Sequence, residues 1–224
     1  MSEGTGAIAA SGTGGAAAAR QERIDRLWLD VYQRLTAGVG HELRNSLNGV
    51  AVNLEVVRTR SGREGVAATA LGSFAASASE QLEHVITITE ALVALGRPAR
   101  SPATIGRFAD QVARLLRPPL SASGGTLDLV VEGEGTTRVP ADGARLLVAA
   151  TMIAAADAAG ADRGGGGEVR CRVRPAGGVE LRVEGRFASP PRLASETERA
   201  AAELAVGVHG TADGITLTFP AQGG

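Results

Sequence analysis

Five aliphatic residues in the N-terminal part of the chain recur at alternating steps of four and three, so they form one stripe along a helix: Leu43, Leu47, Val50, Leu54 and Val57. This spacing is the heptad seam of a coiled coil or helical bundle. Trp28, Val31 and Leu35 continue an apolar face upstream. A helix is therefore predicted over residues 20–60, with this seam directed inward.

A second helix is predicted over residues 66–95, after a glycine-containing turn at residues 61–65. Its apolar side consists of Leu71, Ala75, Ala78, Leu82, Val85, Leu92 and Leu95. Gly96 and Pro98 end it, because proline cannot continue a helix. Two long helices joined by a short turn form a hairpin with little to cover its apolar stripe. Pairing two hairpins into a four-helix bundle covers it, so a homodimer through residues 20–97 is expected.

The regions on either side of the predicted hairpin differ from it in composition and in the pattern of predicted elements. Residues 1–19 are almost all small and are predicted to be disordered, because they cannot offset their ordering entropy. Beyond Pro102, helices are predicted at residues 104–116 (closed by Pro118 and Pro119), 141–159 and 193–208. Strands are predicted at residues 126–131, 136–139, 168–174, 179–184 and 215–219. This order predicts an α+β sandwich over residues 103–221, with helices on one face of a mixed sheet.

Composition argues against several classes of protein. With 23 basic and 24 acidic residues the net charge is −1, which gives no electrostatic reason to expect nucleic acid or anionic lipid as a partner. The single Cys171 can form neither an internal disulfide nor a metal cluster. No apolar run reaches the roughly 18 residues of a membrane span, and the first residues lack the features of a secretion signal. A cytoplasmic protein is expected.

The candidate site lies in the string His41-Glu42-Leu43-Arg44-Asn45-Ser46-Leu47-Asn48. With the seam inward, His41, Asn45 and Asn48 fall together on the outward face of the helix. His41 is therefore expected to be reachable by another protein. Glu42 is expected to hydrogen-bond its imidazole and raise its nucleophilicity, and Asn45 to orient a water or a phosphoryl group. The two other histidines, His84 and His209, are expected to be partly exposed or capping residues.

This string resembles the phosphoacceptor box of bacterial two-component histidine kinases, whose pattern is His-Glu-Leu-Arg-Asn-Pro-Leu. The sequence departs once, with Ser46 at the proline position. That change removes an expected helix kink and keeps the residues of the chemistry. The resemblance covers residues 20–97 as a dimerisation and phosphotransfer hairpin. It implies that residues 103–221 form an α+β domain like the ATPase of histidine kinases and Hsp90.

Three departures from the family's nucleotide motifs imply that this domain is vestigial. The asparagine positions that hold Mg²⁺ and the phosphates are Ala150 and Ala154 here, and a methyl group cannot ligate a hard cation. The adenine motif Asp-x-Gly-x-Gly corresponds to Val183-Glu184-Gly185-Arg186-Phe187, which keeps a carboxylate but puts large residues where glycine allows close approach. The glycine-rich lid is absent, and Pro190-Pro191 stiffen the short connection in its place.

The combination resembles phosphorelay histidine phosphotransferases built from a kinase-like hairpin and a degenerate ATPase domain. The resemblance implies that His41 receives a phosphoryl group from the aspartate of one response-regulator receiver domain and passes it to another. A hybrid histidine kinase would be a further partner. Arg44 is the nearest candidate for charge compensation. No cofactor is expected on this chain, and Mg²⁺ is expected in the receiver's acidic pocket.

The outward face continues from Asn48 to Val52. An exposed valine beside the small Gly49 predicts where a receiver docks; the alternative is that Val52 is covered by the second helix or the C-terminal domain. Three other functions stay open: a divergent autokinase that binds nucleotide through other residues, a non-catalytic scaffold for response regulators, and a phosphatase in which Asn45 positions water.

Overall fold

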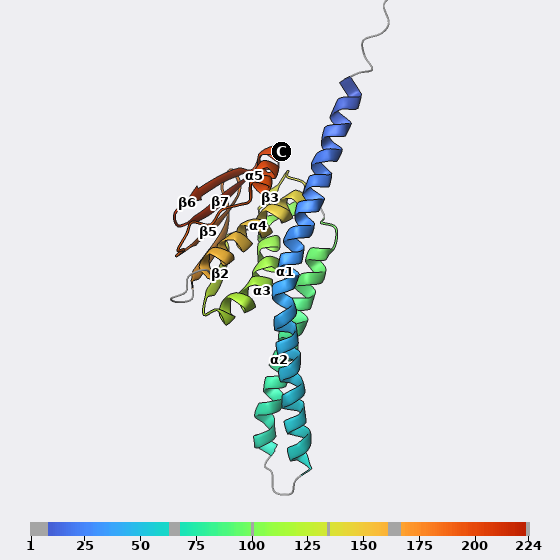
Figure 1. The fold of residues 1–224 in the computed structure, drawn as a ribbon, viewed down its shortest axis with the longest axis vertical. Helices are drawn as coiled ribbons and strands as arrows, with labels where there is room; N and C mark the ends of the chain where they lie inside the picture. The colour runs from blue at the N-terminus through green and yellow to red at the C-terminus, as the bar shows by residue number, and fades with distance from the viewer. Residues whose placement is uncertain (1–8, 63–67, 100, 134, 161–166, 223–224) are drawn as a thin grey trace, which may run out of the picture.

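The computed structural model describes residues 9–62, 68–99, 101–133, 135–160 and 167–222. A long helical hairpin and an α/β domain on one side of its upper half make up these residues (Figure 1). The hairpin consists of α1 (Ala9–Ser61) and α2 (Ala68–Gly96). The two predicted hairpin helices are therefore confirmed, although residues 66–67, the predicted start of the second, lie outside the described residues.

The first helix begins earlier than predicted. It starts at Ala9, so residues 9–19 are helical where composition predicted disorder. Alanine has the highest helix propensity, and the four alanines at residues 16–19 directly precede the predicted helix. A helix that is already nucleated extends through such a run at little cost. Residues 1–8, the rest of the predicted disordered segment, lie outside the described residues.

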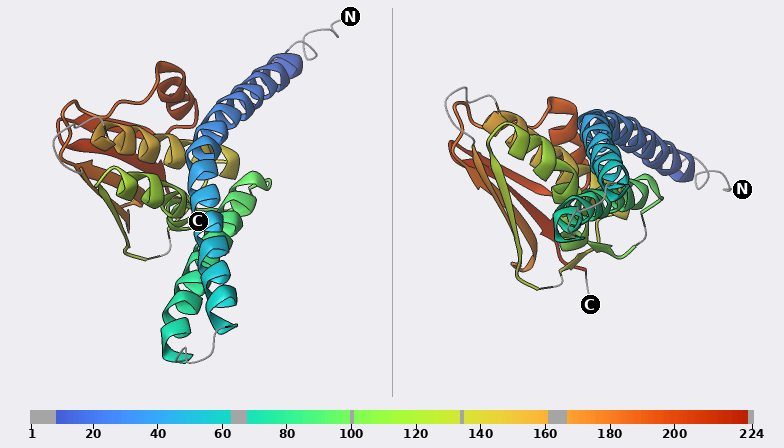
Figure 2. Two further views of the ribbon diagram at one scale, coloured as in Figure 1. Left: turned by 60° about the horizontal axis from the view of Figure 1, so that its bottom comes forward. Right: turned by 90° about the horizontal axis from the view of Figure 1, so that it is seen from below.

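The α/β domain contains a five-stranded sheet in the order β2-β4-β5-β7-β6. Its strands are β2 (Thr126–Val131), β4 (Glu168–Pro175), β5 (Gly178–Gly185), β6 (Gly207–Thr211) and β7 (Gly214–Pro220). The helices α3 (Ile105–Ala122), α4 (Ala141–Gly160) and α5 (Ser195–Glu203) cover one face (Figure 2). Only β2 and β4 pair in parallel within this sheet. The short β1 (Ala103–Thr104) and β3 (Thr136–Thr137) pair separately. The predicted mixed sheet is confirmed.

Helix α4 is the central helix of this domain. It is long and apolar enough to cross a membrane, but most of it is buried inside the fold. Ala144, Leu147, Ala149 and Met152 are fully buried. It is therefore apolar on nearly all sides because it is a core helix, surrounded by other elements.

Two predicted boundaries are wrong. Helix α3 does not stop before Pro118 but continues to Ala122; proline's fixed φ fits a helix, and Leu120 beyond it is buried in the core. The helix predicted at residues 193–208 ends at Glu203, and β6 follows it. Every residue of β6 is exposed, so this strand has no apolar alternation by which its sequence could reveal it.

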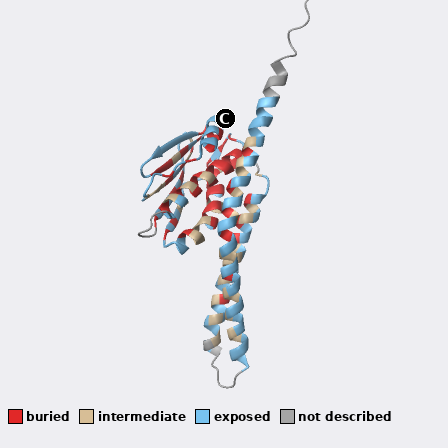
Figure 3. Cartoon of the chain, in the orientation of Figure 1, coloured by how far each residue is buried: buried red, intermediate tan, exposed pale blue. Residues whose placement is uncertain are grey.

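Buried residues gather where the upper hairpin meets the domain, whereas the lower hairpin is mostly exposed or half-buried (Figure 3). The buried hairpin residues at this junction are Ile24, Val31, Leu35 and Val39 of α1 and Ile88, Ala91 and Leu95 of α2. They belong to the same hydrophobic cluster as the core of the α/β domain. Hairpin and domain thus share one core at this level.

Arg145 of α4 ties the domain to both hairpin helices. Only 5% of it is exposed. Its guanidinium donates hydrogen bonds of 2.6 Å to the backbone oxygens of Leu95 and Arg97 and of 2.8 Å to Asp142 Oδ1, and it lies 4.0 Å from the centre of the Trp28 ring. Burial lowers the pKa of this guanidinium, and the charge of Asp142 opposes the shift. The carbonyls that end α2 are therefore satisfied by a residue of the C-terminal domain.

Replacing Arg145 by methionine is expected to lower the free energy of unfolding by about 2–4 kcal/mol, because it leaves two carbonyls without this donor and leaves the Asp142 carboxylate with only the Ala99 N–H. Urea unfolding followed by circular dichroism measures this. The matched control is Arg114→Met on α3, which removes an exposed pair with Asp110 and should cost no more than about 0.5 kcal/mol. Equal losses in the two variants would contradict the bridging role of Arg145.

Candidate functional site

His41 lies on the exposed face of α1, at the level where the domain ends. Two turns above it, Arg34 forms an ion pair with Asp157 of α4. One turn above it, a Cβ at Gly38 would lie 3.9 Å from Pro119 Cγ of α3. Residues 34, 38 and 41 follow a four–three spacing and share one side of the helix. His41 itself is exposed, so this side of α1 leaves the domain contact and enters solvent at His41.

The outward face predicted below His41 is present. Asn45 and Asn48 are exposed, as is Arg44. Val52 is 63% exposed, so neither α2 nor the C-terminal domain covers it. Gly49 lies elsewhere: it faces α2, where a Cβ would come within 2.5 Å of Gln81 Oε1. Gly49 is thus part of the helix–helix contact, whereas Val52, three residues further along, is exposed.

The contact between α1 and α2 below the domain is polar. Ser46 of α1 is buried, with 8% exposed. Asn53 Nδ2 donates hydrogen bonds of 3.2 Å to Ser77 Oγ and 3.4 Å to Gln81 Oε1 of α2. Small and polar side chains therefore occupy part of the α2-facing side of α1.

Part of the predicted seam faces solvent in the single chain. Leu47 and Leu54 are 50% and 53% exposed. On α2, three large aliphatic residues are also about half exposed: Leu82, Ile86 and Val93. Leu43, Val50 and Val57 of the seam are half-buried, and Leu43 packs against the core cluster. Within one chain the seam is therefore only partly directed inward. Both helices also present aliphatic stripes to solvent.

Glu42 contacts a histidine other than the predicted one. Its Oε1 lies 3.3 Å from His84 Nε2 on α2, an ion pair when His84 is protonated. The expected hydrogen bond from Glu42 to the His41 imidazole is replaced by this contact across the hairpin, because Glu42 occupies the α2-facing side of α1 together with Ser46. Glu42 therefore links the two helices at the level of His41.

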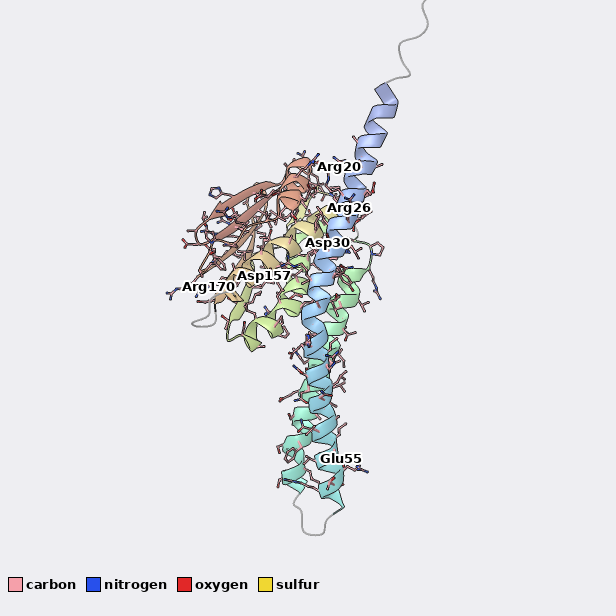
Figure 4. All side chains as sticks on the ribbon, in the orientation of Figure 1. Arg20, Arg26, Asp30, Glu55, Asp157 and Arg170 are labelled. Carbon is pink, nitrogen blue, oxygen red and sulfur yellow. The ribbon has the colours of Figure 1, made fainter. Side chains whose placement is uncertain are left out.

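The α4 positions that match the family's asparagines lie close to the hairpin. Ala150 and Ala154 are half-buried and pack against the core cluster. Thr151 beside them is fully buried. Asp157, one turn further along, is paired with Arg34 (Figure 4 labels Asp157 on the domain side of α1). This face of α4 offers methyl groups and a carboxylate already engaged by α1.

Glu184, the one carboxylate retained from the adenine motif, points away from α4. In β5 the buried Val183 faces the helices, so its neighbour Glu184 lies on the open face of the sheet. There it forms an ion pair with Arg182. Phe187 is half-buried and packs against the core, its ring beside Gly185. The carboxylate and the α4 helix thus stand on opposite faces of the sheet.

Two residues near His41 were missed by sequence reasoning. Arg34 precedes His41 by seven residues, and the heptad spacing already placed it on the same face. His84 is partly exposed, as expected, but nothing in its local spacing connects it to Glu42, since the two lie on different helices. No cluster of three or more His, Cys, Asp or Glu suited to a metal occurs among the described residues.

Comparisons with known proteins found likenesses of structure only. No protein-family model matches the sequence, and no curated protein matches it either. The chain is similar to the histidine kinase domain of the Erythrobacter litoralis EL346 blue-light activated histidine kinase, with 16% identity, a TM-score of 0.45, and 84% of this chain and 94% of that chain covered. It is also similar to the histidine kinase AdeS of Acinetobacter baumannii, with 11% identity, a TM-score of 0.45, and 82% and 98% covered.

A third similar structure is full-length ShkA in complex with AMPPNP, with 18% identity, a TM-score of 0.42, and 86% of this chain and 47% of that chain covered. The first two of these structures are those of histidine kinases. Because all three TM-scores lie below 0.5, what this chain does is inferred from its own residues.

Proposed function

We propose that this protein is a histidine phosphotransferase of a two-component phosphorelay, with His41 as the phosphoryl carrier. A neutral ring nitrogen of His41 attacks the phosphorus of an aspartyl phosphate on a receiver domain. The P–N bond forms as the P–O bond to the aspartate breaks and the carboxylate is regenerated. The reverse step delivers the group to a second receiver. Mg²⁺, where required, would be held by the receiver's acidic pocket.

The observation that supports this proposal is the exposed position of His41. The histidine is exposed, in the phosphoacceptor-like string, on a face free of the domain and of α2. Asn45 is exposed one turn below, and in this proposal it orients the phosphoryl group. Arg44 offers an exposed guanidinium beside it, and guanidinium groups suit phosphoryl oxygens. A docked protein can therefore reach the nucleophile directly.

The residues of the C-terminal domain favour a phosphoryl donor other than ATP. Ala150 and Ala154 supply no oxygen for a cation. Asp157 is engaged by Arg34, and Glu184 lies on the opposite face of the sheet from α4. These features favour transfer between receivers over autophosphorylation.

The aliphatic stripes support a homodimer. Leu47 and Leu54 on α1, with Leu82 and Ile86 on α2, leave a large apolar surface exposed in one chain. Such a surface marks an interface, and a second hairpin related by a two-fold axis would cover both stripes at once. A four-helix bundle then places the polar residues inside each hairpin and the aliphatic seams between hairpins.

Adding MgATP is expected to leave both the thermal unfolding temperature and the phosphorylation of His41 unchanged. A ligand at a hundred times its dissociation constant would stabilise the fold by about 2.7 kcal/mol, which corresponds to a rise of several degrees in a chain of this size. Differential scanning fluorimetry and labelled ATP measure the two quantities, with an active histidine kinase domain as the positive control. A rise of that size, with label on His41, would favour the autokinase instead.

The direct test supplies the phosphoryl group from a phosphorylated receiver domain instead of from ATP. Receiver domains from the same genome are phosphorylated with labelled acetyl phosphate and mixed with the protein. Acid-labile label is expected to appear on this chain after the receivers and the protein are mixed. If no receiver transferred label, while one or more bound, the protein would be a scaffold rather than a carrier.

A further inference from the structure

A cavity of about 460 Å³ lies between α1, α3 and α4. We call it the α1/α3/α4 groove, and its walls include Leu35, Gly38, Leu116, Pro119, Ile153 and Ala156. Its lining is mostly aliphatic. The Arg34–Asp157 ion pair also borders it, and because those two charges neutralise each other, the groove favours an apolar occupant over a charged one.

The groove is continuous with the face that carries His41. Gly38 is in its wall, and His41 follows three residues later on the same side of α1. At 1.5 Å rise per residue the two lie roughly 4.5 Å apart along the helix axis. The α3 and α4 walls extend outward from α1 immediately above His41. A protein that approaches the His41 ring along this side of α1 therefore comes close to the mouth of the groove.

The proposed dimer leaves the groove free. Leu47 follows Gly38 by nine residues, and at about 100° per residue nine residues place it on the opposite side of α1. The same holds for Leu54, which continues the stripe of Leu47. A second hairpin seated on the aliphatic stripes therefore approaches from the side away from the α/β domain. The groove therefore stays accessible to a partner other than the second copy of the chain.

We propose that the α1/α3/α4 groove anchors the receiver domain, by taking an apolar side chain from an element beside the receiver's acidic site. This rests on the proposed function. The contact surface then runs along one side of α1, from the groove through His41 and Asn45 to Val52. An aliphatic pocket next to the reacting atoms supplies affinity by burial, while the polar residues around His41 act on the phosphoryl group. The C-terminal domain thereby contributes to recognition without binding nucleotide.

Two alanines on α4 test this proposal as a matched pair. Ala156 and Ala158 are both half-buried, and Ala156 lies in the groove wall whereas Ala158 does not. Ala156→Arg is expected to raise the KM for the transferring receiver by at least about tenfold, with the transfer rate at saturating receiver unchanged. Ala158→Arg is expected to leave both unchanged. The probe is the isolated receiver domain that labels wild-type His41 most rapidly.

A second pair of variants, at the end of α3, tests the groove again in case the α4 variants misfold. Ser123 is exposed at the groove and Ser121 is exposed outside it. Ser123→Arg is expected to raise the receiver KM as Ala156→Arg does, and Ser121→Arg to have no effect. Thermal unfolding is recorded for all four variants. The same unfolding temperature is expected within the alanine pair, and a slightly lower one for Ser123→Arg than for Ser121→Arg, because the Ser123 hydroxyl donates a hydrogen bond of 2.7 Å to the Leu120 oxygen.

The possible outcomes separate the two proposals. If wild-type His41 accepts label and the groove variants keep the wild-type KM, the groove proposal is overturned and the phosphotransferase stands. If the groove variants dissociate the dimer in light scattering, the groove belongs to a contact between copies, and the proposal is again overturned. If no receiver labels wild-type His41, both proposals fail together.

Discussion

Replacing His41 by glutamine is expected to abolish acceptance of the phosphoryl group, with transfer reduced by at least about 10³-fold. The glutamine amide keeps a similar size and polarity but has no nucleophilic nitrogen. Because His41 is exposed, the free energy of unfolding should change by less than about 0.5 kcal/mol. The measurement is acid-labile label on the protein after mixing with a phosphorylated receiver, with receiver binding recorded in parallel.

His84→Gln is the matched control for this experiment. It removes the chain's other hairpin histidine, which lies across from Glu42, and is expected to leave label on His41. The cost to stability should be about 0–1 kcal/mol, since the pair is partly exposed. Label that persisted on the His41 variant and vanished from the His84 variant would move the acceptor to α2.

Replacing Leu47 by aspartate is expected to convert the dimer into monomers at micromolar concentration. The residue would occur twice in a two-fold interface, and each buried, unpaired carboxylate costs about 2 kcal/mol or more. The two together would weaken association roughly a thousandfold. Light scattering over a dilution series measures the change. Since half of Leu47 is exposed in the single chain, the hairpin itself should stay helical.

Val52→Asp is the matched control, because Val52 is also an exposed aliphatic residue of α1 but lies on the His41 face. It is expected to leave the dimer intact and to weaken receiver binding. Should the two variants dissociate equally, the aliphatic stripe through Leu47 would not be the interface. A wild-type protein that is monomeric and folded at high dilution would contradict the dimer altogether.

The groove proposal gives the C-terminal domain a part in recognition. Its five-stranded sheet and helices keep the architecture that the sequence predicted, yet the α4 face that should hold a nucleotide is engaged by α1. Arg145 and the Arg34–Asp157 pair connect the domain to the hairpin at two levels. A domain held in this position forms a rigid wall beside His41, which suits a docking surface more than a catalytic domain that must deliver ATP.

How far the sequence could predict the fold depends on the kind of signal each element carries. The hairpin helices follow from periodicity over many residues, and the alternating strands β4 and β5 from a period of two. Strand β6 gave no signal, because all of its residues are exposed. Helix α3 continued through Pro118 and Pro119 because burial of Leu120 in the core outweighs two missing backbone donors.

The sequence by itself determined which residues share a face: His41 with Asn45, Asn48 and Val52, and the aliphatic seam apart from them. Only the tertiary structure decided what each face meets. It turned the seam of Leu47 away from α2, paired Glu42 with His84, and placed the groove above His41. The physical reason is that helical periodicity depends on residues within one helix, whereas partners across helices depend on contacts between residues far apart in the chain.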